Sequence, residues 1–263
     1  MPGTDVKVDL VAEQDCLDAV VAELDVHEWA LPTPSPGWSV ADQIGHLHYF
    51  DTKAALAITD PEAFIAHRAE LLARFTVPDA VDEFTLGPYR AMAPDELLAT
   101  WRSGRASLAG AAAPLAEDQR IEWYGPSMSL RSFLTARLME CWAHGQDVVD
   151  AVGADRPATD RLRHIAQLGV ITRRWSYANR GLEAPEGDVR VELEAPSGDV
   201  WKWGPDDAAH RIEGPAEDFC LVVVQRRHVG DTRLRLTGEL ARDWMLKAQA
   251  FAGPPTDAPD RKG

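Results

Sequence analysis

The spacing of apolar side chains changes once along this chain, between residues 181 and 188. Before that point, apolar residues recur at the spacing of an amphipathic helix. After it, the segment DVRVELEAPSG alternates apolar with polar residues, which is the pattern of a half-buried strand. The change predicts a helical bundle over residues 1–182 and a small α+β domain over residues 183–253. We expect the Pro/Asp-rich tail, residues 254–263, to be disordered.

Helix and strand signals can be placed within both regions. Helical periodicity covers residues 6–24, 39–58, 61–75, 94–115, 130–153 and 159–181. Ser39, followed by Asp42 three residues later, and Ser129 are placed to cap helix N-termini, and Gly153 is placed to end a helix. The second region predicts strands within 188–198, 199–205 and 232–239, a helix rather than a buried strand over 218–227, and a last helix over 239–253.

Composition limits the partners of this chain. A formal charge of −15, with no long Lys/Arg run, argues against binding to nucleic acid or to an anionic membrane surface. Three widely spaced cysteines predict no disulfide framework. The N-terminal segment is acidic, and no apolar run is long enough to span a bilayer, so we expect neither a secretion signal nor a membrane span. We therefore expect a cytoplasmic protein, either a monomer or a homodimer, that acts on a small molecule.

Two of the predicted helices carry a candidate metal site. Glu140 and His144 are four residues apart, so their side chains project from one helix face. His46 lies in the middle of the helix predicted over 39–58. If these helices pack side by side, two imidazoles and a carboxylate converge inside a bundle, where such proteins build metal sites. The same spacing also occurs in helices whose histidines only pack or bond to the backbone.

This ligand set would leave coordination positions open, as catalytic sites do. Nitrogen and oxygen ligands suit zinc, with nickel, cobalt and iron as alternatives. Asp147, three residues after His144, is placed to orient that imidazole. Arg137, one turn before Glu140, could bind an anionic group or form a surface ion pair, and Trp123 could line a ligand cavity or simply pack.

The residues around these ligands resemble a known family. PGWSVADQIGHLHYFDTKAALA, with Trp38, Ser39, Asp42 and His46, is similar to the W-[ST]-x-x-D-x-x-x-H-L pattern of the DinB-like superfamily. The later segment WYGPSMSLRSFLTARLMECWAHGQDVVDAVG contains its E-x-x-x-H-x-x-D pattern. The resemblance is to the branch around mycothiol-dependent maleylpyruvate isomerase, and it implies a DinB-like up-down four-helix bundle whose metal ligands are His46, Glu140 and His144.

The C-terminal region resembles the sterol-carrier-like α+β domain that follows the bundle in these proteins, through HRIEGPAEDFCLVVVQRR and TRLRLTGELARDWM. It also resembles a short segment named after wyosine-base formation. The acidity of the chain argues against RNA chemistry.

The resemblance implies a metal-dependent enzyme with mycothiol or a similar thiol as cosubstrate, acting as an S-transferase or isomerase on a small electrophile. Tyr49 and Asp51, which follow His46, are candidates for substrate binding. Two alternatives stay open: a metal-dependent hydrolase, lyase or cyclase, and a protein that binds a metal or ligand without catalysis.

Overall fold

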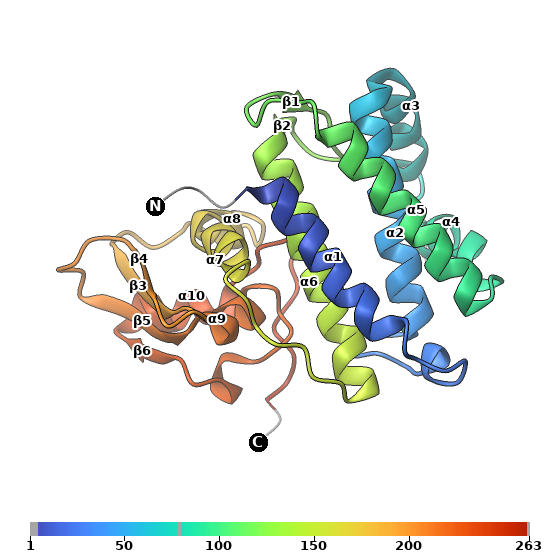
Figure 1. Ribbon diagram of the computed structural model, residues 1–263. Helices are drawn as coiled ribbons and strands as arrows, with labels where there is room; N and C mark the ends of the chain where they lie inside the picture. The colour runs from blue at the N-terminus through green and yellow to red at the C-terminus, as the bar shows by residue number, and fades with distance from the viewer. Residues whose placement is uncertain (1–4, 78–79, 262–263) are drawn as a thin grey trace. The chain divides into compact units, whose positions relative to one another are not determined.

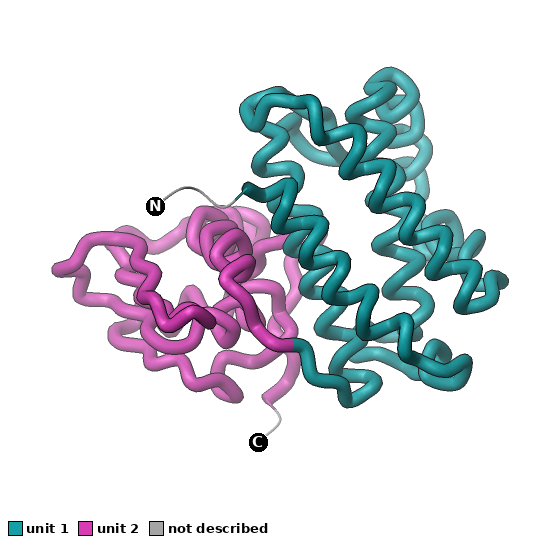
Figure 2. The backbone as a smooth tube through the Cα atoms, in the orientation of Figure 1, with its two compact units in different colours: residues 1–156 teal, residues 157–263 magenta. Residues whose placement is uncertain are grey.

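The computed structural model describes residues 5–77 and 80–261, and the chain divides into two units after Arg156 (Figure 2). Unit 1 is Met1–Arg156 and unit 2 is Pro157–Gly263. The sequence predicted the division after residue 182, so the helical segment 159–181 lies in the other unit. The observed arrangement assigns it to unit 2 because its buried face packs against helix α9 (Ala216–Val223) of that unit.

Unit 1 is built from helices (Figure 1). Its four long helices are α1 (Val6–Val21), α2 (Val40–Thr59), α5 (Pro94–Ala112) and α6 (Leu130–Val152). Its shorter elements are η1 (Glu28–Ala30), α3 (Pro61–Leu72), α4 (Ala80–Arg90), β1 (Arg120–Ile121) and β2 (Met128–Ser129).

The helix directions depart from simple up-down alternation. Helices α3 and α4 carry the chain back between α2 and α5, so α2 and α5 run in the same direction (Figure 1). The C-terminal half of α2 consequently lies near the loop that follows α5, where His67 of α3 also bonds to Tyr124. Helix α2 packs against both α5 and α6. This places the middle of α2 beside the helix that carries Glu140.

The predicted caps are confirmed. Ser39 Oγ accepts from the Asp42 backbone N–H, and the Asp42 carboxylate accepts from the Ser39 backbone, which completes a capping box. Ser129 caps α6 by accepting from the Ser132 backbone N–H, and Gly153 ends this helix with a φ of 66°. Both helices of the candidate site therefore begin at defined residues, which fixes the rotation of their faces.

The core of unit 1 is formed by apolar side chains from all four long helices. It contains Leu17, Val21, Trp29, Val40, Ile44, Leu47, Leu97, Leu98, Trp101, Cys141 and Val148. Ile44 and Leu47, which lie close to His46 in the sequence, are fully buried. The His46 side chain is 15% exposed, so it lies at the edge of the core.

Unit 2 is an α+β domain with a four-stranded sheet in the order β4-β3-β5-β6. Its strands are β3 (Val189–Glu194), β4 (Val200–Trp203), β5 (His210–Pro215) and β6 (Arg235–Thr237), and its helices are α7 (Leu162–Ile171), α8 (Arg173–Ala178), α9, η2 (Val229–Asp231) and α10 (Glu239–Lys247). Strand β3 pairs antiparallel with β4 and parallel with β5, and β5 pairs antiparallel with β6.

Several elements of unit 2 differ from their prediction. The helix preferred over 218–227 is confirmed as α9, but the segment 159–181 breaks at Thr172 into α7 and α8, and β5 was not predicted. The tail has no helix or strand over residues 254–261, yet it is held in place. Thr256 Oγ1 donates to Gln225 Oε1 at 2.6 Å, and Arg180 Nη1 lies 2.8 Å from Asp257 Oδ1. Residues 262–263 lie outside the described part of the chain.

The contact between α7 and α9 gives a testable prediction. A Cβ at Gly169 would lie 2.9 Å from Val223 Cγ1 and 3.0 Å from Phe219 Cε1. Gly169→Ala should therefore lower the free energy of unfolding by about 1–3 kcal/mol, the usual cost of overpacking. The matched control is Gly110→Ala on α5, where nothing lies within 4 Å and the gain in helix propensity should stabilise by about 0.5–1 kcal/mol. Thermal and urea unfolding measure both, and equal effects of the two substitutions would contradict the packing.

Candidate metal centre

The three predicted ligands come together between α2 and α6. His46 projects from α2, and Glu140 and His144 project from successive turns of α6. Glu140 Oε2 lies 3.4 Å from His46 Nε2 and 3.1 Å from His144 Nε2. One ligand atom from each residue lies within 4.8 Å of the other two. Within the described residues this is the group of at least three His, Cys, Asp and Glu side chains that meets the geometry of a metal site.

These distances fit a tetrahedral zinc ion. Ligands about 2.0–2.1 Å from zinc in a tetrahedron are about 3.3 Å from one another. The two separations from Glu140 Oε2, 3.1 and 3.4 Å, are close to that value. Three protein ligands leave a fourth position free, as in catalytic zinc sites. The donor set of two imidazole nitrogens and one carboxylate oxygen also suits nickel, cobalt and iron.

A chain of hydrogen bonds fixes which nitrogen of His144 faces Glu140. The backbone carbonyl of Trp38 can only accept, and Thr33 Oγ1 donates to it at 2.9 Å. Thr33 Oγ1 then accepts from Gln43 Nε2 at 2.8 Å, which turns the Gln43 oxygen toward His144. His144 Nδ1 lies 2.6 Å from Gln43 Oε1 and must donate to it. In neutral His144 the lone pair is therefore on Nε2, which faces the Glu140 carboxylate.

This arrangement leaves two acceptors facing each other. A neutral imidazole nitrogen and a carboxylate oxygen 3.1 Å apart repel unless a proton or a cation lies between them. A metal ion bound to both satisfies each lone pair at once. The orphaned acceptor pair is therefore a physical argument for a cation at this position, independent of sequence resemblance.

The protonation of the ligands also suits a cation. Burial, together with a smaller effect of the neighbouring His144, lowers the pKa of His46 to about 4, so the imidazole is neutral at physiological pH. Burial by itself raises the pKa of Glu140, but the contacts with His144 and His46, when a proton or a cation lies between the imidazole nitrogen and the carboxylate oxygen, outweigh it and hold that pKa well below its usual range. Glu140 is consequently a carboxylate in the folded protein.

The structure assigns the orientation of His144 to Gln43. Asp147, predicted for this role, has its Oδ2 3.9 Å from His144 Nδ1, beyond hydrogen-bond distance, and accepts from Ser35 Oγ at 3.0 Å. Gln43 lies one turn before His46 on α2 and is fully buried. The sequence does show that Gln43 is a polar residue on the core side of the helix that carries His46. Its role as an acceptor for His144, however, depends on Thr33, which lies in a separate loop.

Aromatic rings surround the ligands. The Trp38 ring lies 5.0 Å from the His46 ring and 5.8 Å from the His144 ring, centroid to centroid, and it stacks on the latter. Trp38 Nε1 donates to Asp82 Oδ2 at 2.8 Å, which holds the indole in place. The Phe50 ring lies 4.7 Å from the His46 ring. These rings cover one side of the two imidazoles, while the Glu140 side chain remains 24% exposed.

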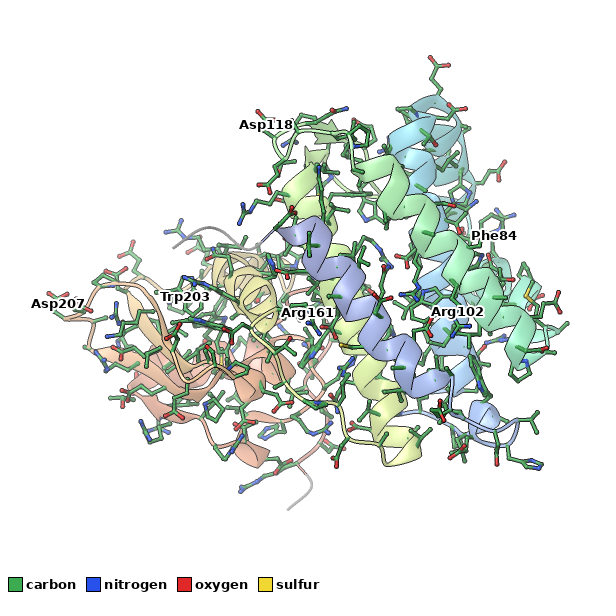
Figure 3. The ribbon with its side chains drawn as sticks, viewed as in Figure 1. Phe84, Arg102, Asp118, Arg161, Trp203 and Asp207 are labelled. Atoms are coloured by element: carbon green, nitrogen blue, oxygen red, sulfur yellow. The ribbon has the colours of Figure 1, made fainter. Side chains whose placement is uncertain are left out.

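Beyond Phe50, Tyr49 belongs to a second polar cluster. His67 Nε2 lies 3.0 Å from Tyr49 Oη and 3.1 Å from Tyr124 Oη. Burial raises the pKa of both tyrosines and lowers that of His67, so all three are neutral. The ring of Phe84, labelled in Figure 3, stacks on His67 at 5.8 Å. Nothing in the sequence around His67 singles it out, because its two partners come from separate segments.

Trp123 packs among aromatic rings beside this cluster. It stacks on Phe64 at 5.4 Å with an interplanar angle of 4°, and its edge contacts Phe133 and Tyr124. Its ring centroid is 6.4 Å from that of Phe50. Trp123 thus lies in the second layer of rings around the ligands, behind Phe50.

Arg137 and Asp51 form a buried ion pair. Arg137 Nε donates to Asp51 Oδ1 at 3.1 Å, and Gln14 Nε2 donates to Asp51 Oδ2 at 3.0 Å. The side chains of Arg137 and Asp51 are 4% and 2% exposed, which excludes the surface ion pair that was the alternative for Arg137. Arg137 Nη2 has no hydrogen-bond partner among the described residues. The charge of Arg137 also lowers the pKa of His46, which places it close to the ligands.

Cys141, next to Glu140 in the sequence, is a core residue as expected. It is 2% exposed within the apolar core of unit 1, and burial raises the pKa of its thiol well above the usual range. It therefore supplies no thiolate to the metal centre.

In the described part of the chain, no helix is both long enough and apolar enough to cross a membrane.

Residues 10–149 match the sequence model of a family described as mycothiol maleylpyruvate isomerase N-terminal domain, and residues 185–238 match one described as wyosine base formation. Two Mycobacterium tuberculosis proteins, the uncharacterized protein Rv0036c of strain H37Rv and the uncharacterized protein MT0041 of strain CDC 1551, are each 48% identical to this chain over 253 residues. The matches cover 94% of this chain and 95% of each relative.

The fold is similar to that of two solved structures. The crystal structure of the mycothiol-dependent maleylpyruvate isomerase has a TM-score of 0.55 and 17% identity, covering 88% of this chain and 91% of that one. A histidine-to-alanine mutant of that protein has a TM-score of 0.56 and 19% identity, covering 84% and 88%. The likeness confirms the predicted fold class, a DinB-like helical domain followed by an α+β domain.

The hydrogen-bond chain predicts how metal affinity responds to substitution. Gln43→Leu removes the acceptor that orients His144 and should weaken zinc binding about 10- to 100-fold, the usual effect of losing such a partner. Asp147→Asn, which removes a charge 3.9 Å from the same imidazole, should weaken it far less. Competition with a chromophoric chelator measures both affinities, and circular dichroism checks that each variant folds. A larger loss in Asp147→Asn would contradict the assignment to Gln43.

Proposed function

Because the chain belongs to the mycothiol maleylpyruvate isomerase N-terminal domain family, we propose that it is a metal-dependent enzyme that uses a low-molecular-weight thiol. The thiol is mycothiol or a close chemical relative, and the reaction is S-transfer to, or isomerisation of, a small electrophile. The observation that carries the proposal is the set of three ligands, two imidazoles and one carboxylate, which leaves a coordination position for a molecule from solution.

The metal has one role in this chemistry. Zinc supplies a positive charge that lowers the pKa of a coordinated thiol, so that a thiolate is available at neutral pH. His46, Glu140 and His144 would hold the ion, and Gln43 would keep His144 in the tautomer that binds it. Trp38 and Phe50 pack against the His46 ring and so hold it in position.

The three candidate ligands include no cysteine, so we infer that the thiol comes from a separate molecule. The protein's nearest cysteine in sequence, Cys141, is buried in the core with a raised thiol pKa. Such a thiol is neutral and does not act as a nucleophile. In this proposal the sulfur that the metal activates therefore belongs to an external thiol, because Cys141 does not supply it.

Arg137 is our candidate for binding an anionic group of the thiol or substrate. Its Nη2 lacks a hydrogen-bond partner, and its charge acts on both His46 and Tyr124. Asp51 is buried and bonded to Arg137 Nε, so we assign it the positioning of that guanidinium rather than contact with substrate. The hydroxyls of Tyr49 and Tyr124 offer neutral polar contacts, and Trp123 supports the apolar wall.

The formal charge of −15 supports a small-molecule substrate in preference to RNA, although residues 185–238 match a model described as wyosine base formation. The three free cysteines suit the reducing cytoplasm in which we place the protein.

The first test measures thiol conjugation by mass spectrometry. The zinc-loaded protein should accelerate the addition of mycothiol to a small electrophile, for example a maleyl compound. Removing the metal with a chelator, or replacing one ligand in His46→Ala, should return the rate to background and remove bound zinc. His27→Ala, in which an exposed histidine away from the ligands is replaced, is the matched control and should keep both zinc and activity. Activity that persists after chelation and in His46→Ala would refute the proposal. Catalysis of hydrolysis by the zinc protein without any thiol would favour an enzyme that activates water.

A second test concerns the neutral polar cluster. Tyr124→Phe removes the hydroxyl 3.1 Å from His67 Nε2 and leaves the ring contacts in place. Loss of one hydrogen bond to substrate should raise KM roughly threefold to tenfold with zinc content unchanged. Tyr177→Phe in unit 2, whose hydroxyl donates to Asp243, is the control and should leave KM at the wild-type value. An unchanged KM in Tyr124→Phe would remove this cluster from the substrate site.

A further inference from the structure

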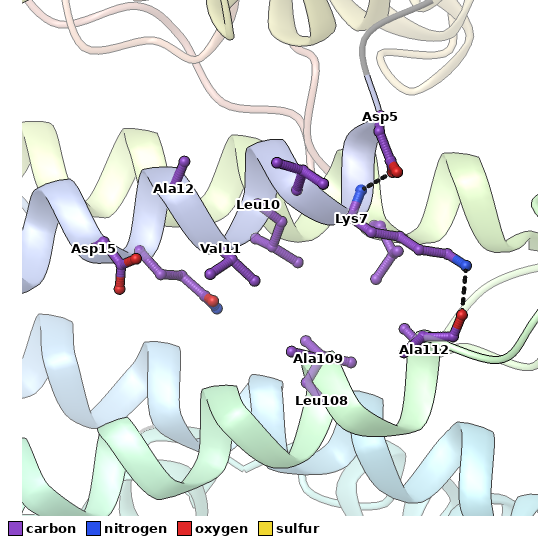
Figure 4. A pocket seen from close by; sticks show the side chains of 13 residues that line it. Asp5, Lys7, Leu10, Val11, Ala12, Asp15, Leu108, Ala109 and Ala112 are labelled. Carbon is purple, nitrogen blue, oxygen red and sulfur yellow. Dashed lines mark hydrogen bonds between the residues drawn. The ribbon is translucent and has the colours of Figure 1, made fainter.

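A separate cavity lies in unit 1 between α1 and α5. Its volume is about 610 Å³, within the range of sites that enclose small molecules. Its walls are mostly apolar, and they include Val8, Leu10, Val11, Leu108, Ala109 and Ala112. In Figure 4, Leu10 and Val11 of α1 face Leu108 and Ala109 of α5 across this space.

Small side chains keep the two helices from closing on each other. Helix α1 packs mainly against α6, and α5 packs mainly against α2, while α1 and α5 make few contacts. Helix α5 presents Ala109, Ala112 and Ala113 to the gap. Opposite them, Val8 and Val11 are 62% and 37% exposed, whereas Val6, Leu10, Leu17 and Val21 of the same helix are buried. Apolar surface of this kind gains free energy when an apolar ligand covers it.

The charged groups around the cavity already have partners. Lys7 Nζ donates to the backbone carbonyls of Ala113 and Leu115, and Asp5 accepts from the Lys7 backbone N–H. Asp15 is paired with Arg105 at 2.6 Å. No cation among these groups is left for an anionic ligand, and the formal charge of −15 disfavours anions further. The ligand that fits is uncharged.

One buried polar group in the lining lacks a partner on one side. Gln14 is 2% exposed and lines the cavity. Its Nε2 donates to Asp51 Oδ2 at 3.0 Å, which fixes the amide orientation. The hydrogen bonds of the described residues leave Gln14 Oε1 without a donor. This oxygen is therefore free to accept a hydrogen bond from a ligand or a water molecule in the cavity.

We propose that this cavity is a binding site for an uncharged, elongated apolar molecule that carries a hydroxyl or amide N–H group. The apolar part lies between α1 and α5, against Leu108 and Ala109. The hydroxyl or amide group donates to Gln14 Oε1. The site is distinct from the metal centre, because none of its lining residues is a metal ligand or belongs to the aromatic wall.

Calorimetric titration of the full-length protein with decanol tests the proposal. Decanol should bind saturably at one site. Methyl nonyl ether, of similar length but without a donor, should bind roughly threefold to tenfold more weakly, the effect of one hydrogen bond. In Gln14→Met, which lacks the acceptor, the two compounds should bind equally.

Two substitutions on α5 form a matched pair. Ala109→Trp fills the cavity and should weaken decanol binding at least about tenfold, because the indole occupies the space of the ligand. Ala106→Trp places the same side chain on an exposed position outside the lining and should leave the affinity unchanged. Circular dichroism confirms that both variants fold.

Three results would overturn the proposal. They are equal affinity of the wild-type protein for alcohol and ether, equal weakening by the two tryptophan substitutions, and the absence of saturable binding. If the cavity instead receives a second copy of the chain, sedimentation will show a wild-type dimer that Ala109→Trp dissociates, and this also contradicts a small-molecule site.

Discussion

The metal centre depends on one backbone carbonyl. Because the carbonyl of Trp38 can only accept, it sets the direction of every hydrogen bond that follows, through Thr33 and Gln43 to His144. Because the direction of this series of hydrogen bonds is fixed at its start, neutral His144 has one tautomer. The lone pair of that tautomer is on Nε2 and faces Glu140. The arrangement that suits a cation therefore depends on a loop outside the two helices as much as on His46, Glu140 and His144 themselves.

The sequence predicted the ligands because their positions are local. Glu140 and His144 share a helix face by spacing, and the caps at Ser39 and Ser129 fix where each helix begins. Gln43 and His67 could not be predicted in the same way, since each acquires its role from partners in other segments. Spacing within one helix predicts which side chains share a face, but hydrogen bonds between segments appear only after folding.

The division into units was mispredicted for a related reason. The apolar face of residues 162–171 indicates that this helix packs, but it does not indicate on which unit. Close packing of Gly169 on α9 decides it. Strand β5 was missed because its segment, HRIEGP, has few apolar residues and gains its stability from pairing with β3 and β6 on both sides.

The buried carboxylate of Asp51 orders the polar groups on both sides of it. Burial raises the pKa of Asp51 and the charge of Arg137 opposes this, so the pair is stable only while both partners remain. Each oxygen of Asp51 accepts one bond, from Gln14 on one side and from Arg137 on the other. The Nε2 of Gln14 is thereby occupied, which leaves its Oε1 for a molecule in the cavity between α1 and α5, while Arg137 Nη2 stays without a hydrogen-bond partner among the described residues. Asp51 thereby sets which polar atoms of Gln14 on α1 and of Arg137 on α6 remain without a protein partner, although it is itself almost inaccessible to solvent.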